Sequence, residues 1–238
     1  PEHVRVQSEN DLTRLQGSKY VQSKMGNIYK NVKEDLEEGR VVLFSGTPCQ
    51  IDALYSYLKN REKNNLFTVD IICHGTPSAK LFAEYLKHIA KNINGKIVDF
   101  RFRDKSGGWG LKGSVIYQDK MDKLRKKTLP IQLSSYYALF LDSETYRENC
   151  YSCKYAGKKR IGDITLGDYW GVEDEHPEIL AENGGRFDKS MGISCVLINT
   201  KKGQQLLDCI EEKIERVPSS YEKIAKRNNQ LKCPSSHS

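Results

Sequence analysis

Residues 41–58 read VVLFSGTPCQIDALYSYL, and residues 66–78 read LFTVDIICHGTPS. Each stretch starts with an apolar run that ends in Gly-Thr-Pro, at 46–48 and again at 75–77, and apolar residues then recur at helical spacing. Proline suits the first turn of a helix, and threonine suits the N-cap before it. The repeated pattern predicts two strand–turn–helix units. Two strands joined through a helix are most simply parallel neighbours with a right-handed crossover.

Both predicted turns carry a cysteine. Cys49 falls in the first turn of the first helix, and Cys73 ends the second strand. The carboxyl ends of neighbouring parallel strands meet at one edge of a sheet, where open α/β sheets bind ligands. The two cysteines are therefore expected to approach each other. Backbone N–H groups and the positive end of the helix dipole stabilise a thiolate at a helix N-terminus.

A C-x-x-C motif, Cys150-Tyr151-Ser152-Cys153, lies further along the chain. Alone it fits half of a zinc site, part of an iron–sulfur site, a redox dithiol or a chance pair. With Cys49 and Cys73 it completes four thiolates, which suit either a 4Fe–4S cluster or a structural zinc ion, and spacing does not separate the two. An odd total of seven cysteines, without a signal peptide, also favours metal or redox chemistry over disulfides.

Other polar and sulfur-bearing positions have simpler interpretations. Cys195 in an apolar strand and Cys209 on an apolar helix face are expected in the core, and Cys233 is expected as a free thiol. His74 is a candidate metal ligand or proton donor, and a hydrogen-bonded turn histidine fits it equally well. Asp168 ends a strand among glycines and aromatic residues, and a strand end with a packed aromatic ring is its simplest interpretation.

The segment Gly17–Ser23, GSKYVQS, offers a cation, hydroxyls and an aromatic ring, as a nucleotide-binding turn does, and an ordinary loop explains it equally well. The common dinucleotide and P-loop fingerprints are absent from the sequence, and so is the nucleophile elbow of a serine hydrolase.

The rest of the chain alternates between apolar runs and turn residues. Strands are expected at 97–103, 113–117 and 124–133, as a hairpin or meander insertion, and then a short helix at 135–141. Further strands are expected at 163–166 and 193–199, and a helix is expected from about 202 to 214. The predicted fold is an α/β (α+β) protein. Its mixed sheet has a parallel part around 41–90 and an antiparallel insertion around 97–133.

Composition favours a folded, soluble domain, since 38% of the 238 residues are hydrophobic and 29% are charged. No apolar run approaches the roughly 18 residues of a membrane span, and no leader is evident, so a cytoplasmic location is expected. Because the chain opens with Pro1, it is expected to be a fragment of a longer protein. Residues 1–230 are predicted to form a single domain, followed by an irregular tail at 231–238.

The net charge of +7 includes clusters at 123–127 and at Lys158-Lys159-Arg160. A solvated surface is the default interpretation of such clusters. Nucleic-acid binding requires a recognition module beside the charge, and the sequence contains none. An acidic protein or an anionic cofactor is therefore the better partner.

Six motifs together resemble the C-terminal domain of the coenzyme F420 hydrogenase/dehydrogenase beta-subunit family, over about residues 5 to 230. They are GSKYVQS (17–23), LFSGTPCQI (43–51), DIICHGTPS (70–78), FRDKSGGWG (102–110), RENCYSCKYAG (147–157) and DITLGDYWG (163–171). Members of this family are iron–sulfur flavoproteins. They pass electrons between a 4Fe–4S cluster, FAD and a substrate such as coenzyme F420, and a related plant enzyme reduces a chlorophyll intermediate instead.

The resemblance implies a site residue by residue. It favours iron–sulfur over zinc and implies cluster ligands at Cys49, Cys73, Cys150 and Cys153. It implies flavin contacts at Ser18, Lys19, Tyr20, Gln22, Ser45, Gly46, Thr47, Pro48 and Asp168. Lys19 would balance phosphate charge, and Thr47 with its helix N-terminus would bind pyrophosphate oxygens. Trp109 or Trp170 is a candidate to pack on the flavin ring, and a core or turn position is the alternative for both. Apart from the resemblance, His74 is a candidate proton relay, although the chemistry requires no side chain as general acid.

The predicted activity is electron transfer, with ferredoxin or another redox subunit as partner and a deazaflavin or other small molecule as acceptor. Family members commonly carry an N-terminal part with a ferredoxin-like C-x-x-C-x-x-C run, which this sequence lacks. A ferredoxin-dependent reductase of another substrate is one alternative, with the cluster at 158–160 docking an acidic ferredoxin. A zinc-stabilised adaptor module that catalyses no reaction is another, and a fragment that folds poorly without its missing part is a third.

Overall fold

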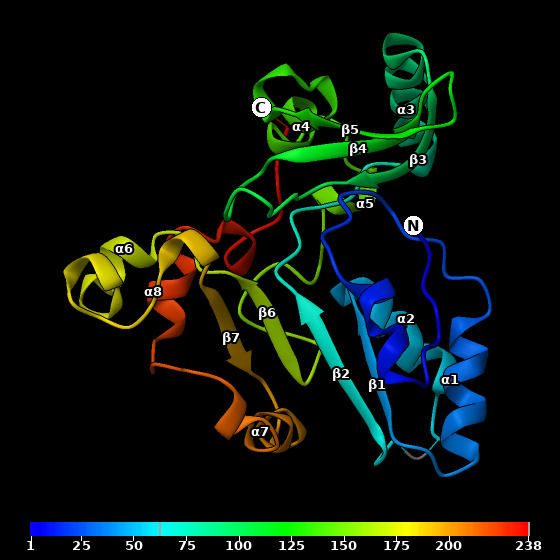
Figure 1. Cartoon of the computed structure of the whole chain (residues 1–238). Helices are drawn as coiled ribbons and strands as arrows, with labels where there is room; N and C mark the ends of the chain where they lie inside the picture. The colour runs from blue at the N-terminus through cyan, green and yellow to red at the C-terminus, as the bar shows by residue number, and fades with distance from the viewer. Residues whose placement is uncertain (62, 238) are drawn as a thin grey trace. The chain divides into compact units, whose positions relative to one another are not determined.

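The computed structural model describes residues 1–61 and 63–237. The chain divides into two compact units (Figure 1). One, called the α/β unit here, comprises Asn27–His74 and Ser152–Ser235. The other, called the antiparallel unit, comprises Pro1–Gly26, Gly75–Tyr151 and Ser236–Ser238.

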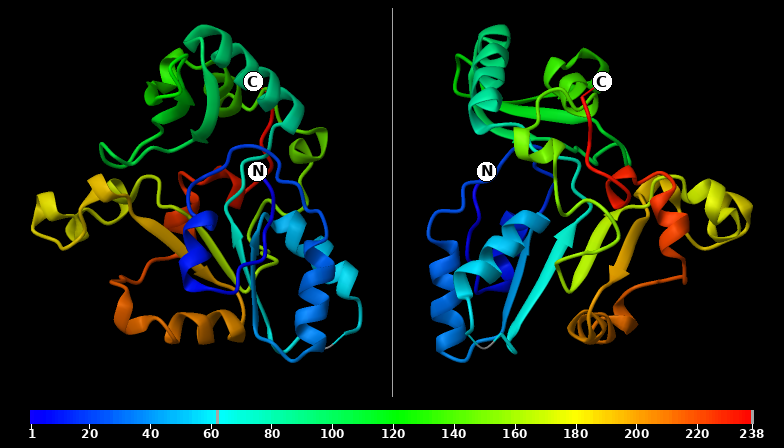
Figure 2. Two further views of the ribbon diagram at one scale, coloured as in Figure 1. Left: turned by 45° about the vertical axis from the view of Figure 1, so that its right-hand side comes forward. Right: turned by 180° about the vertical axis from the view of Figure 1, so that it is seen from behind.

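The α/β unit is built on a four-stranded sheet in the order β1-β2-β6-β7, which Figure 2 shows from two further directions. Its strands are β1 (Val42–Gly46), β2 (Leu66–Ile71), β6 (Ile164–Asp168) and β7 (Ser194–Ile198). The first three are parallel, and β7 runs antiparallel to β6. The predicted parallel strand–helix–strand unit and the mixed sheet are confirmed.

Helices complete the α/β unit, and α2 shows why the sequence forms them. Pro48 occupies the first turn of α2 after Thr47 as N-cap, and Ile51, Leu54 and Leu58 are buried on one face. The helices of this unit are α1 (Ile28–Glu37), α2 (Pro48–Leu58), α6 (Val172–Glu175), α7 (Lys201–Asp208) and α8 (Tyr221–Ala225). Short 3-10 helices lie at Pro177–Ile179, Ala181–Asn183, Lys189–Met191, Glu211–Lys213 and Asn229–Leu231.

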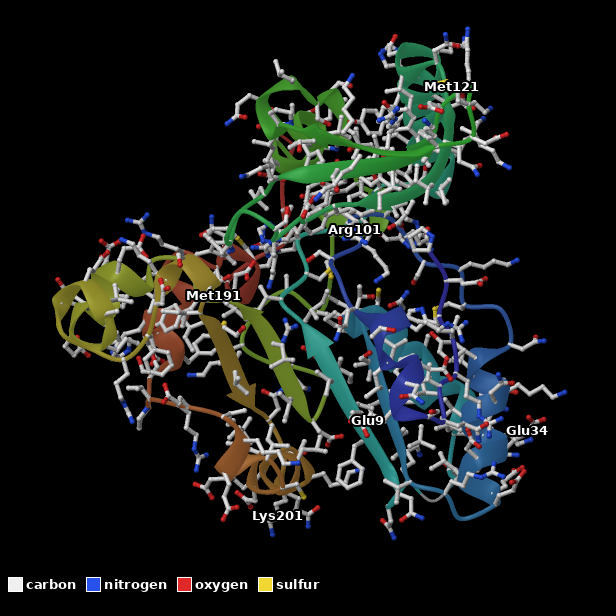
Figure 3. All side chains as sticks on the ribbon, in the orientation of Figure 1. Glu9, Glu34, Arg101, Met121, Met191 and Lys201 are labelled. Atoms are coloured by element: carbon white, nitrogen blue, oxygen red, sulfur yellow. The ribbon has the colours of Figure 1, made fainter. Side chains whose placement is uncertain are left out.

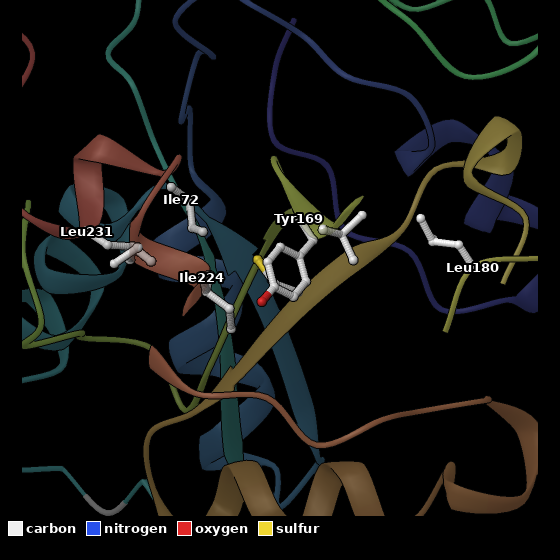
Figure 4. Close-up of a cluster of buried hydrophobic side chains, with 8 residues drawn as sticks. Ile72, Tyr169, Leu180, Ile224 and Leu231 are labelled. Atoms are coloured by element: carbon white, nitrogen blue, oxygen red, sulfur yellow. The ribbon is translucent and has the colours of Figure 1, made fainter. Parts of the chain in front are cut away.

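One hydrophobic cluster of the α/β unit joins the end of β2 to β7 and α8 (Figure 4). Cys195 belongs to this cluster, as predicted. Cys209 does not, because the helix predicted to reach residue 214 ends at Asp208, and Cys209 is the exposed residue that follows. The prediction of a core role for Cys209 was therefore wrong.

The antiparallel unit contains a separate sheet in the order β3-β4-β5. Its elements are β3 (Lys96–Arg101), β4 (Gly113–Gln118), β5 (Leu124–Leu129), α3 (Ala79–Ile93), α4 (Ser135–Leu141) and α5 (Glu148–Tyr151). Two 3-10 helices lie at Glu9–Leu15 and Ile131–Leu133. The predicted insertion is therefore antiparallel, and it forms a sheet of its own. Aromatic residues such as Phe82, Phe102, Tyr136 and Tyr137 fill the core of this unit.

The second Gly-Thr-Pro triplet differs from the first. The N-cap of α3 is Ser78, whose hydroxyl accepts a hydrogen bond from the Leu81 amide, so Thr76 is not the N-cap that the repeat predicts. Pro77 instead forms a β-bridge with Tyr146. Gly75 has a φ of +133°, and a Cβ there would lie 2.3 Å from the Tyr146 ring. The second triplet therefore fixes an irregular turn against an aromatic ring.

Within the described part of the chain, no helix is long and apolar enough to cross a membrane.

Candidate functional site

The candidate site lies at the carboxyl edge of the four-stranded sheet. Gly46 of β1 pairs with Asp70 of β2, and Ile71 of β2 pairs with Leu166 of β6. Because these strands are parallel, the segments that follow them leave from the same edge. The segment after β1 carries Thr47, Pro48 and Cys49, the one after β2 carries Cys73 and His74, and β6 ends at Asp168.

The turn between β1 and α2 is held by local hydrogen bonds. The Thr47 amide donates to Oε1 of Gln50 at 2.9 Å, and the Thr47 hydroxyl lies 3.1 Å from Sγ of Cys49. The Tyr29 hydroxyl donates to the carbonyl oxygen of Gln50 at 2.8 Å. Burial, together with the charge of the Cys49 thiolate, raises the pKa of Tyr29 to about 12. Cys49 itself is exposed.

The segment after β2 meets the end of β6. A Cβ on Gly167 would lie 2.6 Å from Cδ1 of Ile72, so glycine permits the close approach of the two strands. His74 as a whole residue is exposed, while protein atoms surround its imidazole, and its carbonyl oxygen accepts a hydrogen bond from the Ser235 hydroxyl at 2.6 Å. Desolvation by the surrounding protein lowers the pKa of His74, and the Asp168 carboxylate opposes that shift. Cys73 is partly buried.

The segment that carries Cys153 is tied to the other two cysteine-bearing segments. The Tyr155 hydroxyl donates to Oδ2 of Asp52, which lies on α2 one turn after Cys49, and Nζ of Lys154 lies 3.2 Å from the same oxygen. These hydrogen bonds lower the pKa of Asp52. The chain next to Cys153 is thus joined to the first turns of α2.

Arg160 forms the second set of contacts, which joins the segment after Cys153 to the end of β2. Its guanidinium donates to the Ile71 carbonyl, to Oδ1 of Asp70 and to the Tyr155 carbonyl, each at 2.9 Å. Asp70 also accepts from the Gly162 amide at 3.0 Å. Three of the four predicted cluster ligands, those at 49, 73 and 153, therefore sit on segments that contact one another within the α/β unit.

The sequence interpretation of Lys158-Lys159-Arg160 as a surface cluster was wrong for its third member. The side chains of Arg160 and Asp70 are 2% and 0% exposed, so their ion pair is buried. Lys158 pairs with Glu222 at 3.4 Å, and Lys159 is exposed.

Sequence reasoning missed the contacts by which Asp52, Tyr155, Asp70 and Arg160 join these segments. The sequence did contain a signal for Asp52, because it is a carboxylate one helical turn after Cys49. It contained a signal for Asp70 as well, because Asp70 is a charged residue within the apolar run of β2. Neither signal showed which residue the carboxylate contacts.

The fourth predicted ligand, Cys150, belongs to the antiparallel unit, at α5. Its amide donates to the Arg147 carbonyl at 2.7 Å, and the residue is partly exposed. All seven cysteines of the described chain are thiols. Within residues 1–61 and 63–237, no three His, Cys, Asp or Glu side chains gather closely enough to hold one metal ion. In a 4Fe–4S cluster each thiolate binds a different iron atom, so the sulfurs lie further apart than the ligands of a single ion.

The predicted flavin contacts fall into two groups, one in each unit. Ser45, Gly46, Thr47, Pro48 and Asp168 lie at the sheet edge of the α/β unit, whereas Ser18, Lys19, Tyr20 and Gln22 lie in the antiparallel unit.

In the second group, Nζ of Lys19 donates to the carbonyl oxygens of Gln16 and Gly17 at 2.8 and 2.9 Å. The Tyr20 ring stacks on Phe140 with centroids 4.8 Å apart, and this partly buried ring packs against the core of the unit. Trp109 lies under the Arg103 guanidinium, 5.1 Å from it.

An open surface pocket of about 570 Å³ lies between α3 and β3 of the antiparallel unit. Its walls are mainly apolar, and Lys19, Lys87 and Asp99 supply the charged groups. The apolar lining residues include Phe82, Leu86, Ala90, Ile97, Phe100 and Phe102. Lys19 therefore borders a space of the size that small ligands occupy.

Residues 39–220 match the family described as the C terminus of the coenzyme F420 hydrogenase/dehydrogenase beta subunit. The matched range contains β1 and β2, the antiparallel sheet and all four predicted cluster ligands. The search of curated proteins found no match.

Proposed function

Since the chain belongs to the coenzyme F420 hydrogenase/dehydrogenase beta-subunit family, we propose that it is an iron–sulfur flavoprotein oxidoreductase. In this proposal it passes electrons between a 4Fe–4S cluster, FAD and an organic acceptor such as coenzyme F420. The family supplies the redox context of a hydrogenase or dehydrogenase beta subunit. The observation that carries the proposal is the contact among the segments that bear Cys49, Cys73 and Cys153.

Cys49, Cys73, Cys150 and Cys153 would hold the cluster. Four thiols are the donor set that such a cluster requires. The Tyr155–Asp52 hydrogen bond fixes the chain beside Cys153 to α2, and Arg160 fixes it to the end of β2. These contacts restrict how far the three segments can separate, and they support the assignment of the three thiols to one site.

The turn from Ser45 to Pro48 would bind the flavin, with Asp168 at the end of the neighbouring strand. Amides at the start of α2 and the Thr47 side chain are suited to pyrophosphate oxygens. Ser18, Lys19, Tyr20 and Gln22 are the second predicted set, and Lys19 would exchange its contacts with backbone carbonyls for phosphate oxygens. When bound, FAD and the cluster supply the exchange between single electrons and hydride.

His74 would carry the proton that accompanies hydride chemistry. His74 follows β2 at the same sheet edge as Asp168. Ferredoxin or another redox subunit would exchange electrons with the chain, and a cytoplasmic location is part of the proposal. No nucleic acid takes part in it.

Reduction of the acceptor tests this function. The protein is purified without oxygen, its cluster is reconstituted with iron and sulfide, and FAD is added. Dithionite then supplies electrons, and the loss of the visible absorbance of coenzyme F420 is followed. We expect reduction by the wild type and its loss in Cys73→Ser. Cys209→Ser is the matched control, because Cys209 is an exposed thiol outside the proposed set.

Two outcomes would redirect the assignment. Iron-loaded protein that reduces another acceptor but not coenzyme F420 would favour a ferredoxin-dependent reductase of a different substrate. Protein that binds one zinc ion and no iron would favour the adaptor module.

A further inference from the structure

The net positive charge of the chain lies in one of its two units. The antiparallel unit has 18 Lys and Arg against 11 Asp and Glu, whereas the α/β unit has 20 of each. The whole net charge of +7 therefore belongs to the antiparallel unit. Within that unit, residues 96–127 alone hold 10 basic and 4 acidic side chains. This stretch covers the whole β3-β4 pair and most of β5.

Part of this charge is exposed at the hairpin that joins β4 to β5. β5 is an edge strand of its sheet, and residues 124–128 are all exposed. Met121 and Leu124 are 67% and 65% exposed, and Figure 3 labels Met121 at the tip. Large apolar side chains beside lysines provide the apolar contact and the charged rim that protein interfaces combine.

Two of the nearby cations are already neutralised. Arg125 pairs with Asp119 at 2.9 Å, and Lys126 pairs with Asp104 at 2.5 Å. By contrast, Lys120, Lys123 and Lys127 are exposed, and no carboxylate among the described residues forms an ion pair with them. We call Lys120, Met121, Lys123, Leu124 and Lys127 the basic hairpin. Its three ammonium groups are therefore available to an acidic partner.

The tip of the basic hairpin has a fixed shape. Oδ1 of Asp119 accepts from the amides of Met121 and Lys123 at 2.9 and 3.0 Å, and the Asp119 amide donates to the Lys123 carbonyl at 3.0 Å. Asp122 takes a φ of +57°, as tight hairpin turns require. A partner that binds this surface therefore loses little freedom in ordering it.

We propose that the basic hairpin docks an acidic surface of the protein that exchanges electrons with this chain. The docking is argued from charge and exposure, and the identity of the partner as an electron carrier rests on the proposed function. Opposite charges steer the two proteins together, and the exposed Met121 and Leu124 side chains give contact once they meet. The sequence interpretation had assigned docking to residues 158–160. Arg160 is buried there, Lys158 is paired and the α/β unit has no net charge.

Binding to a small acidic plant-type ferredoxin tests the proposal. Affinity is measured by calorimetry on the full chain at about 50 mM salt and again at about 300 mM, since charge–charge attraction is screened over about 10 Å at 0.1 M salt. The triple variant K120E/K123E/K127E is compared with K158E/K159E/K201E, which reverses three lysines of the α/β unit and includes the rival cluster.

We expect the wild type to bind and to lose affinity as salt rises. The K120E/K123E/K127E variant should bind at least about tenfold more weakly, and the control should change by less than about twofold. Lysines on an edge strand also prevent strands of different molecules from pairing. Glutamate keeps that protection, so the variant stays monomeric and a loss of binding reports on docking. The neutral triple variant K120Q/K123Q/K127Q should show an intermediate loss.

Three results would overturn the proposal. They are an unchanged affinity in K120E/K123E/K127E, an equal loss in the control, and failure of the wild type to bind the ferredoxin while it binds duplex DNA or anionic vesicles. Because binding is measured without turnover, a chain without iron still reports on docking. Failure of the proposed function is recognised separately, from the metal content of the protein.

Discussion

Arg160 and Asp70 form a buried ion pair whose partners lie 90 positions apart in the sequence. Each member has further hydrogen bonds: Arg160 to the carbonyls of Ile71 and Tyr155, and Asp70 to the Gly162 amide. Burying two charges is costly unless they are paired and hydrogen-bonded, and these two are both. The pair therefore fixes the segment after the C-x-x-C motif to β2.

Replacing Arg160 with methionine should lower the free energy of unfolding by about 3–5 kcal/mol, because Asp70 is then left as an uncompensated buried carboxylate. Urea denaturation of the metal-free chain measures this change. Lys159→Met, at the exposed neighbouring position, is the control and should change stability by less than about 0.5 kcal/mol. A loss below about 1 kcal/mol in Arg160→Met would contradict this role for the pair.

The thiol of Cys195 should be unreactive in the folded chain. It is 3% exposed, and burial raises its pKa to about 12, so almost no thiolate exists at pH 8. Iodoacetamide labelling followed by mass spectrometry should modify the exposed Cys209 and Cys233 within minutes and leave Cys195 unmodified until urea is added. Comparable labelling of Cys195 and Cys209 in native protein would refute this placement.

At the scale of elements, Asp104 joins the chain after β3 to β5 in the antiparallel unit. Its carboxylate pairs with Nζ of Lys126 and accepts from the Ser106 amide at 3.1 Å. The hydrogen bond from Lys126 is the largest cause that lowers the pKa of Asp104. A carboxylate whose pKa is depressed in the folded state contributes stability above its unfolded pKa, and that contribution is lost as pH falls through the folded value.

Asp104→Asn should therefore destabilise the chain by on the order of 1 kcal/mol at pH 7, since Lys126 is partly exposed and solvent screens the pair. The difference in unfolding free energy between wild type and variant should be constant from pH 7 to about pH 5. Below about pH 4, near the unfolded pKa of an aspartate, it should shrink. Urea denaturation at pH 7, 5 and 3 measures it. A difference that stays constant to pH 3 would show that Asp104 does not act through its charge.

The sequence predicted the helices and strands better than it predicted the contacts between distant segments. The pattern from 41 to 71 predicted β1, α2 and β2 because apolar periodicity and a proline at the first helical turn are local signals. The second Gly-Thr-Pro triplet has the same local signal, and yet Ser78 caps α3, and the Tyr146 ring packs on Gly75. Likewise, the charge run ending at Arg160 contains no information about Asp70. Contacts between distant segments decide such residues.

On the scale of the whole molecule, the region that matches the family includes parts of both units, and the two units differ in net charge. The matched residues 39–220 include most of the α/β unit and the antiparallel sheet. One unit has the sheet edge with Cys49 and Cys73 and is electrically neutral, and the other has all the net positive charge. The total charge was visible in the sequence, but its segregation was not, because each unit is assembled from separate stretches of chain.

Metal analysis of protein purified without oxygen decides whether the four cysteines hold a 4Fe–4S cluster. Iron, acid-labile sulfide and zinc are measured per chain, together with the visible spectrum before and after dithionite. We expect about four irons and four sulfides per chain and a broad brown absorption that bleaches on reduction. Cys73→Ser should lower the iron content, whereas Cys209→Ser should not. A colourless protein with one zinc ion per chain would contradict the cluster assignment.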